Sequence, residues 1–227
     1  MVIKKIKGPT KKDRILVLAP HPDDESLGCF GYIHKALKSG AKVKVIVLTD
    51  GKFLSKTEQR YKETIETMEK AGLKRKNIFF LGFRDLHLKR TVYCTTVLIK
   101  IISSFKPTII FSTSNYDFNI DHKACYYHLK KALEKIKNKP KVYYYLIHYI
   151  FFPFPRGLKP NKKIFPPLTL INSKRTWFKL ELTEKETKLK KEAILNYKSQ
   201  LRMLLFVTKK KLFSFIRRNE LFYKENT

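Results

Sequence analysis

The stretch that decides the fold is 14–25, which reads RILVLAPHPDDE. Its first half, 14–19, is an apolar run of strand length, typical of a strand that is buried on both faces of a parallel sheet. Its second half is a turn that carries one histidine and three successive carboxylates. Residues 26–38 follow with apolar side chains at helical spacing, and the pair Ser39-Gly40 is a typical helix end. The stretch therefore predicts a strand, an acidic turn and a helix.

The same alternation continues through the first two thirds of the chain. A second apolar strand at 43–48 completes a βαβ unit. Strands and helices that alternate in this way imply an open parallel sheet with helices on both faces and right-handed connections. We therefore predict an α/β fold, a Rossmann-like three-layer sandwich with a mostly parallel sheet and a C-terminal extension. The later elements that we expect are helices at 56–70, 91–105 and 121–137 and strands at 78–81, 108–111 and 142–147.

The pattern changes after residue 150, where five prolines between residues 153 and 167 interrupt the chain. One more strand is expected near 174–182, followed by a helix that runs to about Gln200 and begins with a capping box of Thr183 and Glu186. We expect one domain over 1–200, with its core at 14–150 and proline-rich and C-terminal elements at 151–200. The basic aromatic tail at 201–227 mixes bulky apolar residues with lysines, so it either packs on that domain or lies at an interface.

The chain of 227 residues carries a formal net charge of +30. That charge favours polyanions such as nucleic acid, an anionic membrane or phosphorylated substrates, unless it only reflects AT-rich codons. No nucleic-acid recognition motif is present, so we expect no specific nucleic-acid partner. The three cysteines are far apart, no secretion signal is evident, and no stretch of about 20 apolar residues occurs. We expect a cytoplasmic protein, with peripheral contact to an anionic membrane left open.

Polar residues that can do chemistry follow each of the first four strands. In an open parallel sheet, ligands bind beyond the carboxyl ends of the strands, so these residues should converge at one edge. The groups are His21, Asp23 and Asp24 after the first strand, 49–51 after the second, 82–85 after the third and 115–122 after the fourth.

The turn after the first strand has the composition of a zinc site. His21 and Asp24 supply a nitrogen and an oxygen ligand from one turn, and His122 from a neighbouring loop would leave one coordination position open. Asp23 then lies beside the metal and is free to take a proton from water during hydrolysis. The alternative is that the carboxylates only cap the next helix, although three in succession exceed what a cap needs. The pattern therefore favours a metal-dependent hydrolase.

Taken together, these motifs resemble the PIG-L or LmbE-like family of deacetylases, whose hallmark is Ala-His-Pro-Asp-Asp-Glu after the first strand. Here Pro20 stands in place of the alanine. The resemblance extends from about Ile15 to Gln200, and the combination of motifs is specific, whereas each later motif alone is weak. The further matching positions are Thr49-Asp50-Gly51, Arg60, Glu63, Leu81-Gly82-Phe83-Arg84-Asp85, Asp121-His122 and Tyr197-Lys198-Ser199-Gln200.

The resemblance implies one zinc ion held by His21, Asp24 and His122, with Asp23 as the general base. It also implies removal of the N-acetyl group from a GlcNAc-type amino sugar or sugar conjugate. The sugar would be free or carried on a nucleotide or a glycolipid, as in the synthesis of cell-surface glycans.

Three further residues at the same edge are candidates for supporting roles. Arg84 would bind a substrate phosphate or hydroxyl through its two-pronged guanidinium. Asp50 would accept hydrogen bonds from sugar hydroxyls, although we favour a structural role in its loop. Asp121 would either orient a metal ligand or cap the following helix.

One position departs from the family pattern. Many relatives have His-x-Asp-His before the fourth helix, whereas 119–122 here reads NIDH, with Asn119 in the place of the first histidine. An asparagine amide can donate a hydrogen bond to a developing oxyanion, but it cannot supply a proton. Asp23 would then act as both base and acid, unless His148 or His87 enters the site.

Two other functions are compatible with the sequence. A polyanion-binding or membrane-surface-binding protein on an inactive deacetylase scaffold would account for the +30 charge and for the missing histidine. A hydrolase that removes a different acyl group, or a metal-dependent transfer enzyme, would keep the same site.

Overall fold

The computed structural model describes residues 2–52, 56–171, 174–203 and 206–226. The predicted first strand is β2 (Arg14–Ala19), in which every residue after Arg14 is fully buried. It pairs in parallel with β3 (Lys42–Thr49) on one side and with β5 (Ile109–Thr113) on the other. A strand with neighbours on both edges and helices on both faces meets no water, which is why its sequence is continuously apolar.

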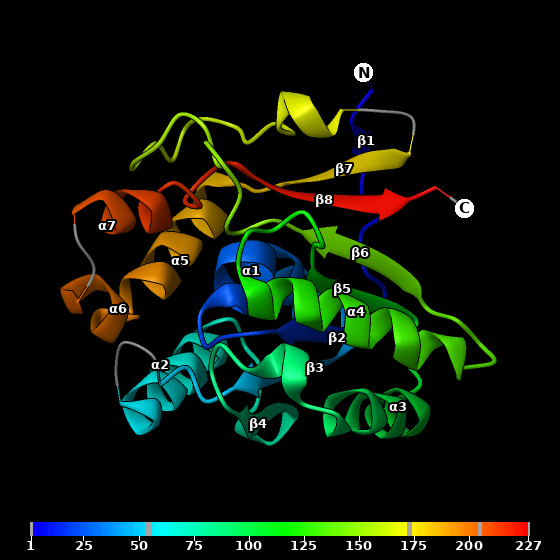
Figure 1. Ribbon diagram of the computed structural model, residues 1–227. Helices are drawn as coiled ribbons and strands as arrows, with labels where there is room; N and C mark the ends of the chain where they lie inside the picture. The colour runs from blue at the N-terminus through cyan, green and yellow to red at the C-terminus, as the bar shows by residue number, and fades with distance from the viewer. Residues whose placement is uncertain (1, 53–55, 172–173, 204–205, 227) are drawn as a thin grey trace.

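The strands form one eight-stranded sheet with the order β1-β7-β8-β6-β5-β2-β3-β4. Neighbouring strands are parallel except around β8, which runs antiparallel to both β6 and β7 (Figure 1). The predicted α/β fold with a mostly parallel sheet is therefore confirmed. The remaining strands are β1 (Lys4–Lys5), β4 (Ile78–Phe83), β6 (Lys141–Tyr145), β7 (Arg175–Glu181) and β8 (Asn219–Glu225).

Four helices connect the parallel strands. α1 (Asp24–Lys38) and α2 (Thr57–Lys70) lead from β2 to β3 and β4, and α3 (Tyr93–Phe105) and α4 (Ile120–Glu134) lead back to β5 and β6. Because right-handed connections in opposite directions along a sheet lie on opposite faces, the two pairs of helices form separate layers (Figure 1). The direction reverses between β2 and β5, and such a switch point leaves a crevice at the carboxyl ends of the strands.

The C-terminal part completes the layer of α1 and α2. α5 (Glu184–Leu195) packs on both of these helices and begins with the predicted capping box of Thr183 and Glu186. It ends at Leu195, earlier than expected, and the shorter helices α6 (Lys198–Met203) and α7 (Phe206–Phe213) follow. The 3-10 turns are η1 (Arg75–Asn77), η2 (Leu88–Arg90) and η3 (Leu168–Leu170). Within the described residues, none of the helices has the length and apolar composition needed to cross a bilayer.

The strand β8 was not predicted from the sequence. It belongs to the tail at 201–227 and lies between β6 and β7, with Phe222 and Tyr223 fully buried. Its sequence, NELFYKE, is dominated by polar residues at both ends. The buried carboxylate of Glu220 is compensated by Lys190 of α5 at 2.6 Å and by the backbone N–H groups of Gly31 and Tyr32. Leu204 and Leu205 of the same tail lie outside the described residues.

Candidate active site

The acidic turn is held in a conformation that ordinary side chains seldom adopt. Asp23, between the end of β2 and the start of α1, has φ of 120°. Its backbone N–H donates to Oε2 of Glu25 at 3.1 Å, and its carbonyl accepts from the N–H groups of Ser26 and Leu27. Arg60 of α2 donates to the carbonyl of the preceding proline at 2.6 Å and to Oδ2 of Asp23 at 3.2 Å. These contacts compensate for a backbone strain of roughly 1–3 kcal/mol and direct the Asp23 carboxylate into the site.

The side chains of the three predicted ligands converge at the carboxyl ends of β2 and β5. Nδ1 of His21 lies 3.3 Å from Oδ2 of Asp24 and 3.2 Å from Nε2 of His122. Nε2 of His122 lies 3.0 Å from the same Asp24 oxygen. All three side chains are buried. Two distant parts of the chain therefore present two nitrogens and one oxygen to a common point.

In each histidine ring one nitrogen faces the common point (the inner nitrogen) and the other faces away from it (the outer nitrogen), and contacts of the outer nitrogens hold the rings in this orientation. Nδ1 of His122 lies 3.0 Å from Oδ2 of Asp117. Nε2 of His21 lies 3.2 Å from Oδ2 of Asp121 and 3.1 Å from Oδ1 of Asp85. Carboxylates accept hydrogen bonds, so the outer nitrogens carry the N–H groups, and in the neutral rings the inner nitrogens present lone pairs.

The converging atoms fit a tetrahedral zinc ion. Ligand atoms at about 2.0–2.1 Å from such an ion lie roughly 3.3 Å from one another, which is the spacing between His21, Asp24 and His122. When both rings are neutral, the lone pairs of the three inner atoms repel one another, and either a proton on a ring or a cation at their centre removes that repulsion. A second group of His21, Asp85 and Asp121 also converges, but the Asp121 oxygens already accept from the N–H groups of Leu86 and Leu88.

The electrostatics of the cluster also call for a positive charge. Burial alone would lower the pKa of His122, but the carboxylates of Asp117 and Asp24 outweigh it and raise that pKa to about 9. Burial alone would raise the pKa of Asp24, but the two histidines hold it well below its usual range. The pKa of His21 is raised well above its ordinary value by Asp121, Asp24 and Asp85, against the effect of burial. Several buried carboxylates are thus stabilised only by positive charge nearby, and a divalent metal ion bound by the histidines and Asp24 would provide it.

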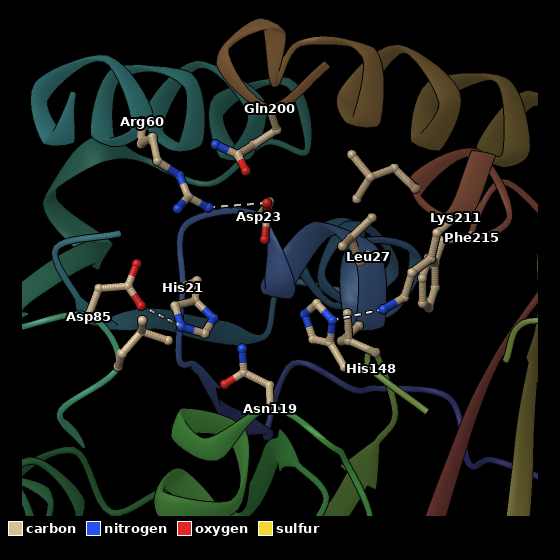
Figure 2. A pocket seen from close by; sticks show the side chains of 13 residues that line it. His21, Asp23, Leu27, Arg60, Asp85, Asn119, His148, Gln200, Lys211 and Phe215 are labelled. Carbon is tan, nitrogen blue, oxygen red and sulfur yellow. Dashed lines mark hydrogen bonds and ion pairs between the residues drawn. The ribbon is translucent and has the colours of Figure 1, made fainter. Parts of the chain in front are cut away.

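The cluster opens into a pocket of about 190 Å³. Figure 2 shows Asp23 and Arg60 on one side of this pocket and His148 with Lys211 on the other. Burial raises the pKa of Asp23 to about 7, although Arg60 opposes that rise. The predicted base therefore faces the pocket beside the converging ligands, as a group that activates water must.

Asn119 lies at the start of α4 on the wall of the same pocket. Its Oδ1 accepts from the backbone N–H groups of Asp121 at 2.8 Å and His122 at 3.4 Å, so the residue is the N-cap of α4. Its side-chain nitrogen is turned towards the pocket (Figure 2). The capping role that the sequence suggested for Asp121 belongs to Asn119, and Asp121 instead contacts His21.

The two residues expected to bind substrate lie outside this pocket. Arg84 and Asp50 line a neighbouring hollow of about 340 Å³, which shares Asp85 and Leu86 with the first pocket. Oδ1 of Asp50 accepts from the backbone N–H of Asp85 at 3.1 Å, in keeping with a structural role in its loop. The Arg84 side chain is exposed.

His87 and His148 were considered as the proton donor that Asn119 cannot be, and the structure places them in different cavities. His87 lines the neighbouring hollow, whereas His148 lines the pocket itself. Lys211 of α7 lies with Nζ 2.8 Å from Nδ1 of His148. Burial, His122 and Lys211 lower the pKa of His148 to about 3, so its ring is neutral at physiological pH. A neutral imidazole that already accepts from Lys211 is a poor proton donor.

The sequence did not single out three of the residues that shape the site. Asp117 lies in the 115–122 segment that was expected to contribute to the site, only five residues before His122. A carboxylate at this spacing could have been recognised in the sequence as a partner of the histidine ring. Glu25 was seen as part of the acidic turn, but its hydrogen bond from Tyr197 joins the turn to the segment before α6. Lys211 had no local signal, because its place in the pocket depends on how α7 packs.

Comparisons with known proteins show what this chain is similar to. The chain is 28% identical over 145 residues to the probable N-acetyl-alpha-D-glucosaminyl L-malate deacetylase 2 of Bacillus subtilis, a match that spans 57% of this chain and 65% of that relative. The match therefore covers less than two thirds of that relative's length. The fold is similar to the N,N'-diacetylchitobiose deacetylase from Pyrococcus horikoshii, with a TM-score of 0.68, 20% identity and coverage of 97% of this chain and 87% of that one. It is also similar to the conserved protein TT1542 from Thermus thermophilus, with a TM-score of 0.65, 23% identity and coverage of 89% and 84%.

The family model described as PIG-L, GlcNAc-PI de-N-acetylase, matches residues 16–133. This range is more than half of the chain, and it contains the acidic turn, Asn119 and His122. The three residues whose ligand atoms converge, His21, Asp24 and His122, also lie within this range. The chain therefore belongs to the PIG-L family.

Proposed function

We propose that this protein is a zinc-dependent N-deacetylase that hydrolyses the acetamide of a GlcNAc-type sugar or sugar conjugate. The observation that carries the proposal is the convergence of His21, Asp24 and His122 within 3.3 Å of one another, beside a pocket that Asp23 also lines. The family and the Bacillus subtilis relative, whose names describe deacetylation of N-acetylglucosamine compounds, support it.

The three ligands would hold one zinc ion and leave a position open for the reaction. Bound there, zinc would polarise the acetamide carbonyl and lower the pKa of a water molecule towards about 7. Asp23 would take the proton from the attacking water, since its carboxylate faces the pocket and Arg60 fixes its direction. The same group would return the proton to the nitrogen as the C–N bond breaks, releasing acetate and the free amine.

Asn119 would stabilise the developing negative charge on the carbonyl oxygen. Its Oδ1 is occupied as the cap of α4, and its side-chain nitrogen is left to donate into the pocket. Such a donor acts without a proton transfer. Asp23 would therefore perform both proton transfers, and Asp121 would orient His21 from outside the ligand set.

The substrate would extend from the pocket into the neighbouring hollow. Asp85 and Leu86 line both cavities, so a sugar in the first would place its substituents near the second. Exposed Arg84 would bind a phosphate or hydroxyl of the carrier, and Asp50 would contribute through its loop.

The test combines metal content with acetate release. Purified protein is expected to contain about one zinc per chain and to release acetate from N-acetylglucosamine or a conjugate of it. Asp23→Asn should keep the zinc and lose activity by roughly 10²–10⁴-fold, because only the proton acceptor is removed. His122→Ala should lose both. Activity that survives Asp23→Asn would contradict the proposed base.

A second function is favoured by one observation, the net charge of +30. A polyanion-binding protein on an inactive scaffold would bind heparin or RNA with steep salt dependence, and His122→Ala would not change that binding. Absence of acetate release from every N-acetyl sugar tried, with such binding present, would favour this function over the deacetylase.

A further inference from the structure

An exposed apolar surface lies on residues 149–168, which we call the aromatic segment. It runs from the end of β6 to η3 and surrounds a hollow of about 400 Å³ lined mainly by aromatic, aliphatic and proline side chains. Six large apolar side chains of this segment are between 48% and 86% exposed, far more than a folded protein needs to leave in water. They are Ile150, Phe151, Phe154, Leu158, Phe165 and Leu168.

The charges around this surface are mostly positive. Residues 135–180 contain eleven lysines and arginines and no aspartate or glutamate. Within the aromatic segment, Lys159, Lys162 and Lys163 are exposed. α7 adds exposed Lys210, whose carbonyl accepts from the backbone N–H of Gly157 at 3.2 Å, so this helix and the segment are in contact. One of these cations, Lys163, pairs with Glu181 at 3.1 Å, so the apolar surface is bordered mainly by cations.

The same surface borders the mouth of the active-site pocket. Asn119 and His148 line that pocket. Tyr149, which follows His148, is the first residue of the aromatic segment and lines its hollow, and Phe118, which precedes Asn119, packs against it. Phe118 is 56% exposed and stacks on Tyr149, with ring centroids 5.3 Å apart. In Figure 1 the yellow-green coil after β6 passes close to α7, which carries Lys211 into the pocket.

We propose that the aromatic segment and the neighbouring lysines dock this protein on an anionic lipid bilayer, with the pocket mouth towards the headgroups. Phe151, Phe154 and Leu168 enter the interfacial region of the bilayer, where aromatic and aliphatic side chains leave water. Lys159, Lys162 and the other cations contact the anionic headgroups. From the sequence, contact with lipid is conceivable for the basic tail and for the aromatic residues of 143–154. The apolar surface includes 149–154 of that block and extends to Leu168, and α7 of the tail adds Lys210 at its border.

Two other occupants fit these observations less well. A second copy of the chain would place two surfaces with the same excess of cations against one another, which disfavours a symmetric interface. A nucleic acid would pair with the lysines, but exposed aliphatic side chains such as Leu168 and Ile150 would gain nothing from its phosphates. An anionic bilayer satisfies both the charge and the apolar surface.

The experiment is flotation of the full chain with vesicles. Wild-type protein should float with vesicles of phosphatidylglycerol mixed with phosphatidylcholine, and weakly or not at all with phosphatidylcholine alone. Replacing Phe151, Phe154 and Leu168 together by serine should weaken binding by roughly tenfold or more. Lys162→Glu with Lys163→Glu should weaken it too, and high salt should do the same. Circular dichroism confirms that these surface variants are folded.

Matched controls separate this proposal from general hydrophobicity and from the proposed function. Val92→Ser with Tyr93→Ser removes side chains that are 81% and 75% exposed at the distant start of α3, and it should leave vesicle binding unchanged. His122→Ala should also bind vesicles normally, because docking does not require the ligand cluster. The proposal is overturned if the triple serine variant floats as well as the wild type. It is also overturned if the Val92→Ser and Tyr93→Ser control loses as much binding as the triple serine variant, or if the triple variant only abolishes a dimer.

Discussion

Asp117 accepts a hydrogen bond from Nδ1 of His122 at 3.0 Å, and both residues lie between the end of β5 and the first turn of α4. The same carboxylate accepts from the backbone N–H groups of Ile147 at 2.9 Å and of His148 at 2.9 Å, just beyond β6. His122 is thereby oriented from a neighbouring strand end and presents Nε2 to His21 and Asp24. The orientation of this ligand is set by packing before any metal binds.

Asp117→Asn should weaken zinc binding by about 10–100-fold. The amide keeps the shape and one acceptor for the histidine N–H, but it removes the negative charge that makes the ring a better ligand. Competition with a chromogenic chelator measures the affinity. Asp13→Asn, in a surface turn that bonds to Thr10, is the control and should bind zinc as the wild type does. Equal affinities of the two variants would show that Asp117 does not tune His122.

Substitutions at Asn119 should separate its two roles. Asn119→Ala removes the cap of α4 and should lower the free energy of unfolding by about 1 kcal/mol, whereas Asn119→Asp keeps a capping oxygen and should restore most of that loss. Both variants lack the amide donor, so both should lose acetate release by about 10²-fold. Urea unfolding and acetate assays measure the two effects. An aspartate variant with full activity would exclude the donor role.

Gly28→Ala should destabilise the fold, because α1 passes directly against a fixed ring. A Cβ at position 28 would lie 2.4 Å from Cδ2 of Tyr145, whose hydroxyl donates to the carbonyl of Leu18 at 2.8 Å. The ring is buried and cannot move away without losing that bond, so we expect a loss of about 1–3 kcal/mol. Gly8→Ala is the control, since among the described residues its Cβ would meet nothing within 4 Å. Equal urea midpoints for the two variants would contradict the prediction.

Glu186→Gln should lower stability at neutral pH but not in acid. Burial opposes ionisation of Glu186, but Lys35, at 2.6 Å, and Thr183 outweigh it and hold its pKa below the ordinary value. A carboxylate with a lowered pKa in the folded state stabilises above its unfolded pKa, and that contribution is lost as the pH falls through the folded pKa. Glutamine retains the capping box, so the variant isolates the charge.

The difference between wild type and Glu186→Gln is therefore expected to be about 0.5–1 kcal/mol at pH 6–8 and to shrink below about pH 4. Urea unfolding across this range measures it. Glu184→Gln, whose side chain is 88% exposed in the same turn, should show a smaller effect at every pH. A difference that grows in acid would have the wrong sign.

The central elements and the turn that carries His21 and Asp24 were predictable because their signals are local. Apolar runs mark buried parallel strands, and the turn at 21–24 lies where β2 ends. His122 was predictable as a partner because carboxyl ends of parallel strands share one edge of the sheet. The strand β8 was missed because its polar residues become acceptable only in the fold, where Lys190 pairs with Glu220.

The sequence by itself determined the α/β alternation, the acidic turn and the residue types that can bind a metal, since each depends on neighbours a few positions away. Only the tertiary structure decided which ring nitrogens face Asp24, that Asn119 rather than Asp121 caps α4, and that Lys211 reaches His148. It also separated Arg84 from the pocket and joined the aromatic segment to its mouth. These features depend on contacts between segments far apart in the chain, which local periodicity and spacing do not encode.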